Sequence, residues 1–209
     1  MKSAHVVVTL AILATLASAQ HKKQSKLSKP ETPQAIHRSS LIVDTHADTP
    51  QRFLDENFDL AQNTSVTEGH IDFDKIKQGN LGAEFFSIWV EPEFKGRYSE
   101  RAFELIDSVY RQAERHPDKM TMAFSADDIL RARKQGKFAA LMGIEGGHAI
   151  ENDPALLRDF YRLGVRYMTL TWSNTNDWAD SSGDINNPAI KHHNGMTDFG
   201  KDVVREMNR

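Results

Sequence analysis

Short apolar runs alternate along this chain with segments that have the spacing of an amphipathic helix. The apolar runs span residues 41–43, 83–90, 138–144 and 165–171, and the second of them is rich in β-branched and aromatic residues. Runs of this kind predict strands, and the run at 41–43 has the pattern of a strand that is buried on both faces. Strands that alternate with helices form parallel sheets, so the pattern predicts an α/β fold.

Helices are predicted over residues 99–115, 125–135, 154–163 and 199–208. The first two begin at Ser99 and Ser125, and serine is a preferred N-cap residue. Four strand–helix units therefore follow one another. A complete TIM barrel has eight such units and typically ~250 residues, whereas this chain has 209. The pattern by itself fits about half a barrel and equally an open parallel sheet.

The N-terminal segment has the features of a secretory signal peptide over residues 1–19. Lys2 precedes an apolar run at residues 6–16, and small residues then precede a predicted cleavage before Gln20. The alternative is an uncleaved membrane anchor, but the run is shorter than the ~20 residues that a membrane-spanning helix needs. We therefore expect a secreted or periplasmic protein without a membrane span after cleavage.

A polar stretch rich in Lys, Ser and Pro follows the signal peptide and predicts a flexible linker over residues 20–38. Regular structure is expected from about Ala35. The predicted barrel domain then covers residues 39–209.

The composition limits the chemistry of any site. No cysteine is present, which excludes disulfides, thiolate metal ligands and a cysteine nucleophile. The formal net charge is −3, so there is no broad basic surface for nucleic acid. A metal site here must use His, Asp and Glu, which suits zinc, manganese or iron.

His46 and Asp48 directly follow the first predicted strand. Residues two apart on a strand point to the same side, and the C-terminal end of a barrel strand faces the mouth where barrel enzymes have their sites. Imidazole and carboxylate are natural zinc ligands. The same His-x-Asp spacing recurs at His70 and His116, but these lie in a polar connection and a turn, where solvated surface histidines are expected.

Glu145 leaves the third predicted strand in the segment Gly143-Ile144-Glu145-Gly146-Gly147-His148. Carboxylates are rarely buried without a partner, and glycines let the backbone pass close to a ligand. A glutamate can bridge two cations, which two-metal sites hold ~3.5–4 Å apart. The alternative is an ordinary turn with an exposed glutamate. For His148, a packing or helix-capping role is favoured over a role as a hydrogen-bond donor to a metal ligand.

Residues 169–180, after the fourth predicted strand, contain Trp172, Trp178 and several side-chain amides. This composition is typical of a substrate-binding wall, and a structural turn with packed tryptophans would have it too. His192 and His193 lie in a polar loop and are expected to be solvated.

Together these features resemble the membrane dipeptidase family, the renal-dipeptidase-like zinc peptidases. The resemblance runs from about Leu41 to Arg209 in ordered segments, at residues 44–50, 79–87, 143–148, 167–171, 178–180 and 195–200. It implies a TIM (β/α)8 barrel of the metal-dependent hydrolase type, of which about the first half is present. It also implies two zinc ions per complete site, which share a hydroxide that hydrolyses dipeptides. By position His46 and Asp48 hold one zinc, and Glu145 bridges both as a catalytic residue.

The chain departs from the family pattern in two respects. Many members have a substrate-contacting histidine where this chain has Trp172, and an indole donates one hydrogen bond but takes up no proton. The histidines that complete the second zinc site lie on later strands in the family, beyond the four strands predicted for this chain.

We therefore expect the 209-residue chain to be unstable or inactive on its own. The alternatives are a non-catalytic half-barrel that binds a ligand or assembles with a partner, including as a homodimer, and another amidohydrolase-type hydrolase.

Overall fold

The computed structural model describes residues 32–209, which belong to two compact units divided after Ser40. In the first unit, Thr32 caps helix α2 (Pro33–Ser39) by accepting a hydrogen bond from the backbone N–H of Ala35. Regular structure therefore begins slightly before the expected Ala35. The predicted signal peptide and most of the predicted linker lie outside the described residues.

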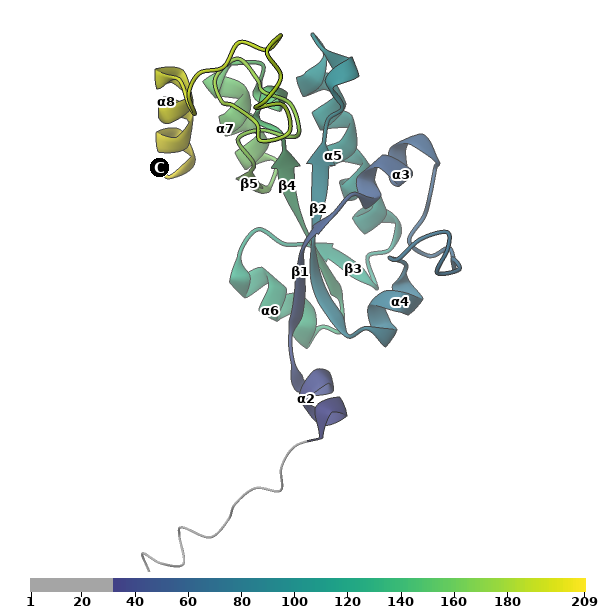
Figure 1. Ribbon diagram of the computed structural model, residues 1–209. Coiled ribbons are helices and arrows are strands. Elements are labelled where there is room, and N and C mark those ends of the chain that lie inside the picture. Colours follow the sequence, from purple (N-terminus) through teal and green to yellow (C-terminus); the bar gives the residue numbers. More distant parts are fainter. Residues whose placement is uncertain (1–31) are drawn as a thin grey trace, which may run out of the picture. The chain divides into compact units, whose positions relative to one another are not determined.

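The second unit contains a five-stranded parallel sheet with helices on both sides (Figure 1). The strands are β1 (Ile42–Ala47), β2 (Leu81–Trp89), β3 (Met120–Met122), β4 (Phe138–Glu145) and β5 (Val165–Met168). The α-helices are α3 (Thr49–Asp55), α4 (Phe73–Gln78), α5 (Tyr98–Arg115), α6 (Ala126–Lys134), α7 (Pro154–Arg162) and α8 (Asp198–Met207), and two short 3-10 helices are η1 (Pro92–Phe94) and η2 (Gly147–Ile150). Within residues 32–209, no helix has the length and apolar character needed to cross a membrane.

The strand order is β1–β2–β4–β3, and β5 also pairs with β4. β3 pairs with residues 138–140 of β4 and β5 with residues 142–144, so two short strands share one edge of β4. Every pair is parallel, which confirms the α/β prediction. Strand β3 and helices α3 and α4 were not predicted, because elements of three to seven residues are too short to show a clear period.

Strand β4 separates two apolar layers. Its even-numbered residues, such as Met142 and Ile144, pack into the larger core beside α5, together with Phe86 of β2. Its odd-numbered residues Ala139 and Leu141 pack on the other side, against α6, and Figure 1 shows α6 across the sheet from α3 and α5. Both faces of β4 are thus covered, which explains its continuous apolar run. By the same alternation, the last residue of β4 faces the α6 side.

Strand β1 is not buried on both faces, so that prediction is wrong. Residues 43–46 are exposed, and Val43 is 37% exposed. The physical reason is its position, since β1 is an edge strand and pairs within the described sheet with β2. Its register against β2 shifts between Asp44 and Ala47, and such irregularities re-aim the side chains at the end of a strand.

Helix α5 is capped from a distant loop and not by Ser99. Arg97 is its N-cap residue and makes no side-chain cap. The carboxylate of Glu151 accepts hydrogen bonds from the backbone N–H of Tyr98 at 2.8 Å and from the Ser99 hydroxyl at 3.1 Å. Ser125 does cap α6 as predicted, by accepting from the N–H of Asp128.

Candidate metal centre

Three candidate ligands meet at the carboxyl end of the sheet. His46 lies near the end of β1, Asp48 directly follows that strand, and Glu145 is the last residue of β4. The carboxyl ends of parallel strands meet at one edge of a sheet, so side chains from strands far apart in sequence converge there.

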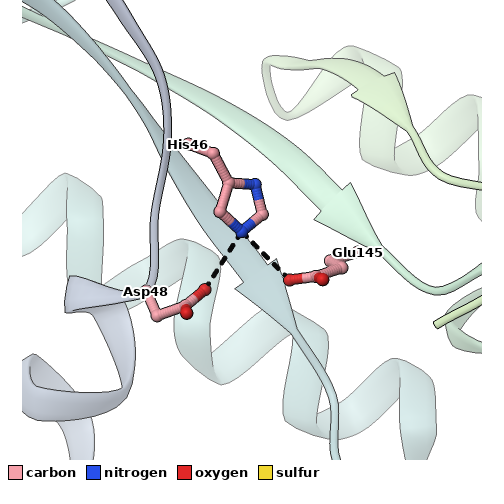
Figure 2. A group of neighbouring side chains, drawn as sticks. All are labelled: His46, Asp48 and Glu145. Carbon is pink, nitrogen blue, oxygen red and sulfur yellow. Dashed lines mark ion pairs between the residues drawn. The ribbon is translucent and has the colours of Figure 1, made fainter. Parts of the chain in front are cut away.

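The three side chains point toward one another (Figure 2). Nε2 of His46 lies 3.3 Å from Oδ1 of Asp48 and 3.1 Å from Oε2 of Glu145. One potential ligand atom from each residue lies within 4.8 Å of the others. No other group of three or more His, Asp or Glu among residues 32–209 has this geometry. The structure therefore brings together all three residues that the sequence analysis selected.

The charges of this cluster favour a cation. The described ion pairs of Asp48 and Glu145 are with His46, and none is with a lysine or arginine. The Asp48 side chain is 62% exposed and that of Glu145 is 22% exposed. Two carboxylates directed at one imidazole leave an excess of negative charge, which a metal ion at the open edge of the sheet would neutralise.

Ser87 supports Glu145 from the intervening strand. Its hydroxyl donates a hydrogen bond of 3.1 Å to Oε2 of Glu145, and in the β2–β4 register Ser87 pairs with Gly143. Ser87 was not among the predicted site residues, although a polar residue inside an apolar strand is a signal that could have found it.

Tyr167 contacts the other side of the His46 ring, with Oη 3.0 Å from Nδ1. Burial raises the pKa of Tyr167 to about 12, and the nearby Glu145 carboxylate adds to this effect. The phenol therefore keeps its proton at neutral pH. Tyr167 lies in one of the segments that resemble the family, but no site role was predicted for it.

The other histidines have different surroundings. His70 is exposed as predicted. His116 is not a solvated surface residue, because its Nε2 lies 2.6 Å from Oδ1 of Asp59 and its ring packs against Phe73. Both partners are distant from His116 in the sequence, so the local sequence pattern of a turn could not predict these contacts.

His148 has a packing role. It is 6% exposed, its Nε2–H donates to the carbonyl oxygen of Val90 at 2.8 Å, and its ring packs edge-on against Tyr98. Burial lowers the pKa of His148. This agrees with the favoured reading from the sequence.

The predicted solvation of His192 and His193 is wrong, because both are partly buried. The ring of His193 lies 3.0 Å from the carbonyl oxygen of Asn176. Asp180 accepts hydrogen bonds from the backbone N–H groups of His193 and Gly195. These contacts close the long loop between β5 and α8.

The two tryptophans after β5 differ in environment. Trp178 is 1% exposed and packs against Phe199, so it is a core residue. Trp172 is partly buried, and its ring centroid lies 5.1 Å from that of Trp89. Trp89 pairs in register with Glu145 and by strand alternation lies on the same face as Ser87. The Trp89–Trp172 pair therefore borders the candidate metal centre.

The family model and the curated relatives that match this chain agree on one family. The family model "Membrane dipeptidase (Peptidase family M19)" matches residues 31–209. Dipeptidase tcpJ of Claviceps purpurea (strain 20.1) is 41% identical over 160 residues, which is 72% of this chain and 37% of that protein. Dipeptidase 3 of Mus musculus is 34% identical over 179 residues, which is 84% of this chain and 36% of that protein. The chain thus spans less than half the length of these relatives.

Solved structures share the fold. The probable dipeptidase PvdM from Pseudomonas aeruginosa superimposes with a TM-score of 0.72 at 22% identity, over 84% of this chain and 46% of PvdM. A metallo peptidase from Rhodobacter sphaeroides, liganded with a phosphinate mimic of the dipeptide L-Ala-D-Ala, gives a TM-score of 0.66 at 21% identity, over 81% of this chain and 56% of that one. The five parallel strands correspond to part of a TIM barrel of the metal-dependent hydrolase type. The chain belongs to the membrane dipeptidase family of metallopeptidases.

Proposed function

We propose that this chain contributes a zinc site to a dipeptidase, with His46, Asp48 and Glu145 as the metal ligands. One observation carries the proposal: Nε2 of His46 is within 3.3 Å of Asp48 and 3.1 Å of Glu145 at the carboxyl end of the sheet. Family membership supports peptide hydrolysis, and the geometry supports these three residues as the ones that hold the metal.

The donor set fits zinc. Zinc binds imidazole nitrogen and carboxylate oxygen, and catalytic sites commonly use three protein ligands and leave a further position open. A zinc ion bound here would supply a Lewis acid that polarises a carbonyl and lowers the pKa of water.

The ligands differ in what they contribute. His46 supplies a neutral nitrogen, and Asp48 supplies a carboxylate at the solvent side. Glu145 contacts both His46 and Ser87 through Oε2, which leaves Oε1 as the second donor of a carboxylate that can bridge two zinc ions. In this role Glu145 is a catalytic residue.

Trp172 is proposed as a substrate-binding residue. With Trp89 it forms an aromatic wall beside Glu145, and a wall of this kind favours a dipeptide with an apolar side chain. Trp172→Ala is expected to weaken binding of such a dipeptide, whereas Trp172→Phe retains much of it because the apolar surface is kept.

Three protein ligands are enough to hold one metal ion, whereas hydrolysis with a bridging carboxylate requires two metal ions. We therefore propose that the 209-residue chain binds one zinc ion firmly and does not hydrolyse dipeptides efficiently by itself. Robust hydrolysis of dipeptides by the purified chain with added zinc would contradict this part of the proposal.

The experiment that tests the function measures zinc-dependent recognition of a dipeptide. The probe is the phosphinate mimic of L-Ala-D-Ala that is bound in the Rhodobacter sphaeroides relative. We expect the zinc-loaded chain to bind it, and a chelator or Glu145→Gln to abolish this binding. A chain that binds zinc but ignores the mimic contradicts the assignment to dipeptides, and a chain that binds no zinc contradicts the metal site.

A further inference from the structure

The hydroxyl of Tyr167 has two polar neighbours on the strand that carries His46. It donates a hydrogen bond of 3.1 Å to the carbonyl oxygen of Thr45, and it lies 3.0 Å from Nδ1 of His46. A carbonyl can only accept, so the single hydroxyl proton points to Thr45. When Nε2 of His46 binds a metal ion, the remaining contact is a hydrogen bond from Nδ1–H of His46 to a lone pair of the Tyr167 hydroxyl.

We infer that Tyr167 is a positioning residue for the metal centre, because it fixes the His46 ring with a proton on Nδ1 and with Nε2 directed at Asp48 and Glu145. This inference rests on the proposed zinc site. A histidine that binds a metal through one ring nitrogen usually donates the other N–H to a fixed acceptor, which sets its tautomer and orientation. A phenol performs this task without adding a further negative charge beside two carboxylates.

The fold holds the Tyr167 ring rigidly over the sheet. Tyr167 pairs in register with Gly143 of β4, and its ring lies directly on that glycine, since a Cβ at position 143 would come within 2.1 Å of Cζ. Phe85 of β2 flanks the ring at a centroid distance of 5.5 Å. The side chain therefore reaches from β5 across β4 and β2 to β1, and Gly143 is the residue that makes this path possible.

His46 needs such support because of its location. It lies on the edge strand β1, and its side chain is 40% exposed, so burial restrains its ring only in part. Tyr167 contacts both the ring of His46 and the backbone of the preceding residue. The phenol therefore ties the orientation of the ligand to the position of its own strand.

The first experiment compares the zinc affinity of the wild-type chain with that of Tyr167→Phe, by competition with a chromophoric chelator. Removal of a partner behind a metal ligand typically costs ~10–100-fold in affinity, and we expect a loss of about 10-fold here. Tyr161→Phe is the matched control, because Tyr161 is 64% exposed and lies outside the cluster. Gly143→Ala keeps the hydroxyl but displaces the ring, and it should weaken zinc binding as well. Wild-type affinity in Tyr167→Phe would overturn the inference.

A second experiment does not depend on zinc. Carbon-13 relaxation of the imidazole ring reports how freely the His46 side chain moves in the metal-free chain, and His46→Gln identifies its signals. We expect the ring to be more mobile in Tyr167→Phe than in the wild-type chain and in Tyr161→Phe. Equal mobility in all three chains would overturn the inference. If the chain binds no zinc, the proposed function fails, and this measurement still decides the role of Tyr167.

Discussion

His46 on β1 contacts Glu145 on β4 across an intervening strand, with Nε2 3.1 Å from Oε2. Strand β2 lies between them and supplies Ser87, which donates to the same carboxylate oxygen. Three neighbouring strands thus build the cluster, and Asp48 joins it from the residue that follows β1. The contact depends on the parallel sheet, because only that arrangement brings these strand ends to one edge.

The first prediction separates His46 from the other histidines that have an aspartate two residues later. His46→Gln is expected to abolish zinc binding, because it removes the nitrogen between the two carboxylates. His70→Gln is the matched control, since His70 is exposed. Isothermal titration with zinc measures both. Equal affinities for the two variants would show that the metal lies elsewhere.

The second prediction concerns pH and Glu84. This carboxyl group is 0% exposed, and neither of its oxygens has a hydrogen-bond partner within the described part of the chain. Burial raises the pKa of Glu84 from 4.5 to about 8, and the negative charge of Asp44 adds to the shift. Between pH 4.5 and about 8 the folded chain keeps the proton of Glu84, whereas the unfolded chain loses it. The free energy of unfolding therefore falls as the pH rises through this range.

Glu84→Gln should remove most of this dependence of the free energy of unfolding on pH, because glutamine has the same shape and does not ionise. Urea unfolding near the lower and the upper end of the pH range measures the dependence. At the upper end the variant should be more stable than the wild type. Glu114→Gln is the control, since Glu114 is exposed on α5. A wild-type chain whose stability is flat across this pH range would refute the prediction.

The third prediction concerns the distant cap of α5. Glu151→Ala removes the acceptor for the backbone N–H of Tyr98 and for the hydroxyl of Ser99. Loss of a helix cap costs about 1 kcal/mol, and we expect a decrease of that order in the free energy of unfolding. Glu151→Gln keeps an acceptor oxygen and should lose less. Denaturant unfolding distinguishes the variants, and an alanine variant as stable as the wild type would argue against the cap.

The fourth prediction concerns export. If residues 1–19 are a signal peptide, a secretory host should release a product whose N-terminal sequence begins at Gln20. Ala19→Pro is expected to hinder cleavage, because proline is incompatible with the small-residue cleavage site. Recovery of intact Met1 in the exported protein would contradict the assignment.

Much of the fold was accessible from sequence because its signals are local. The apolar runs at 83–90 and 138–144 became β2 and β4 with small changes at their ends. Ser125 acts as the predicted cap because its partner is three residues away. His46 and Glu145 were found because each lies at the carboxyl end of a strand, where parallel sheets have their sites.

The sequence by itself determined the α/β class, most of the strands and helices, and the three candidate ligands, because periodicity, caps and strand ends depend on neighbouring residues. Only the tertiary structure decided that β1 is an exposed edge strand, that Ser87 supports Glu145, that Glu151 caps α5 and that Tyr167 reaches His46. Each of these features joins segments that are far apart in the chain. The physical reason is that such contacts depend on strand order, register and the space left by a glycine such as Gly143, and a local pattern carries no information about which distant side chains will meet.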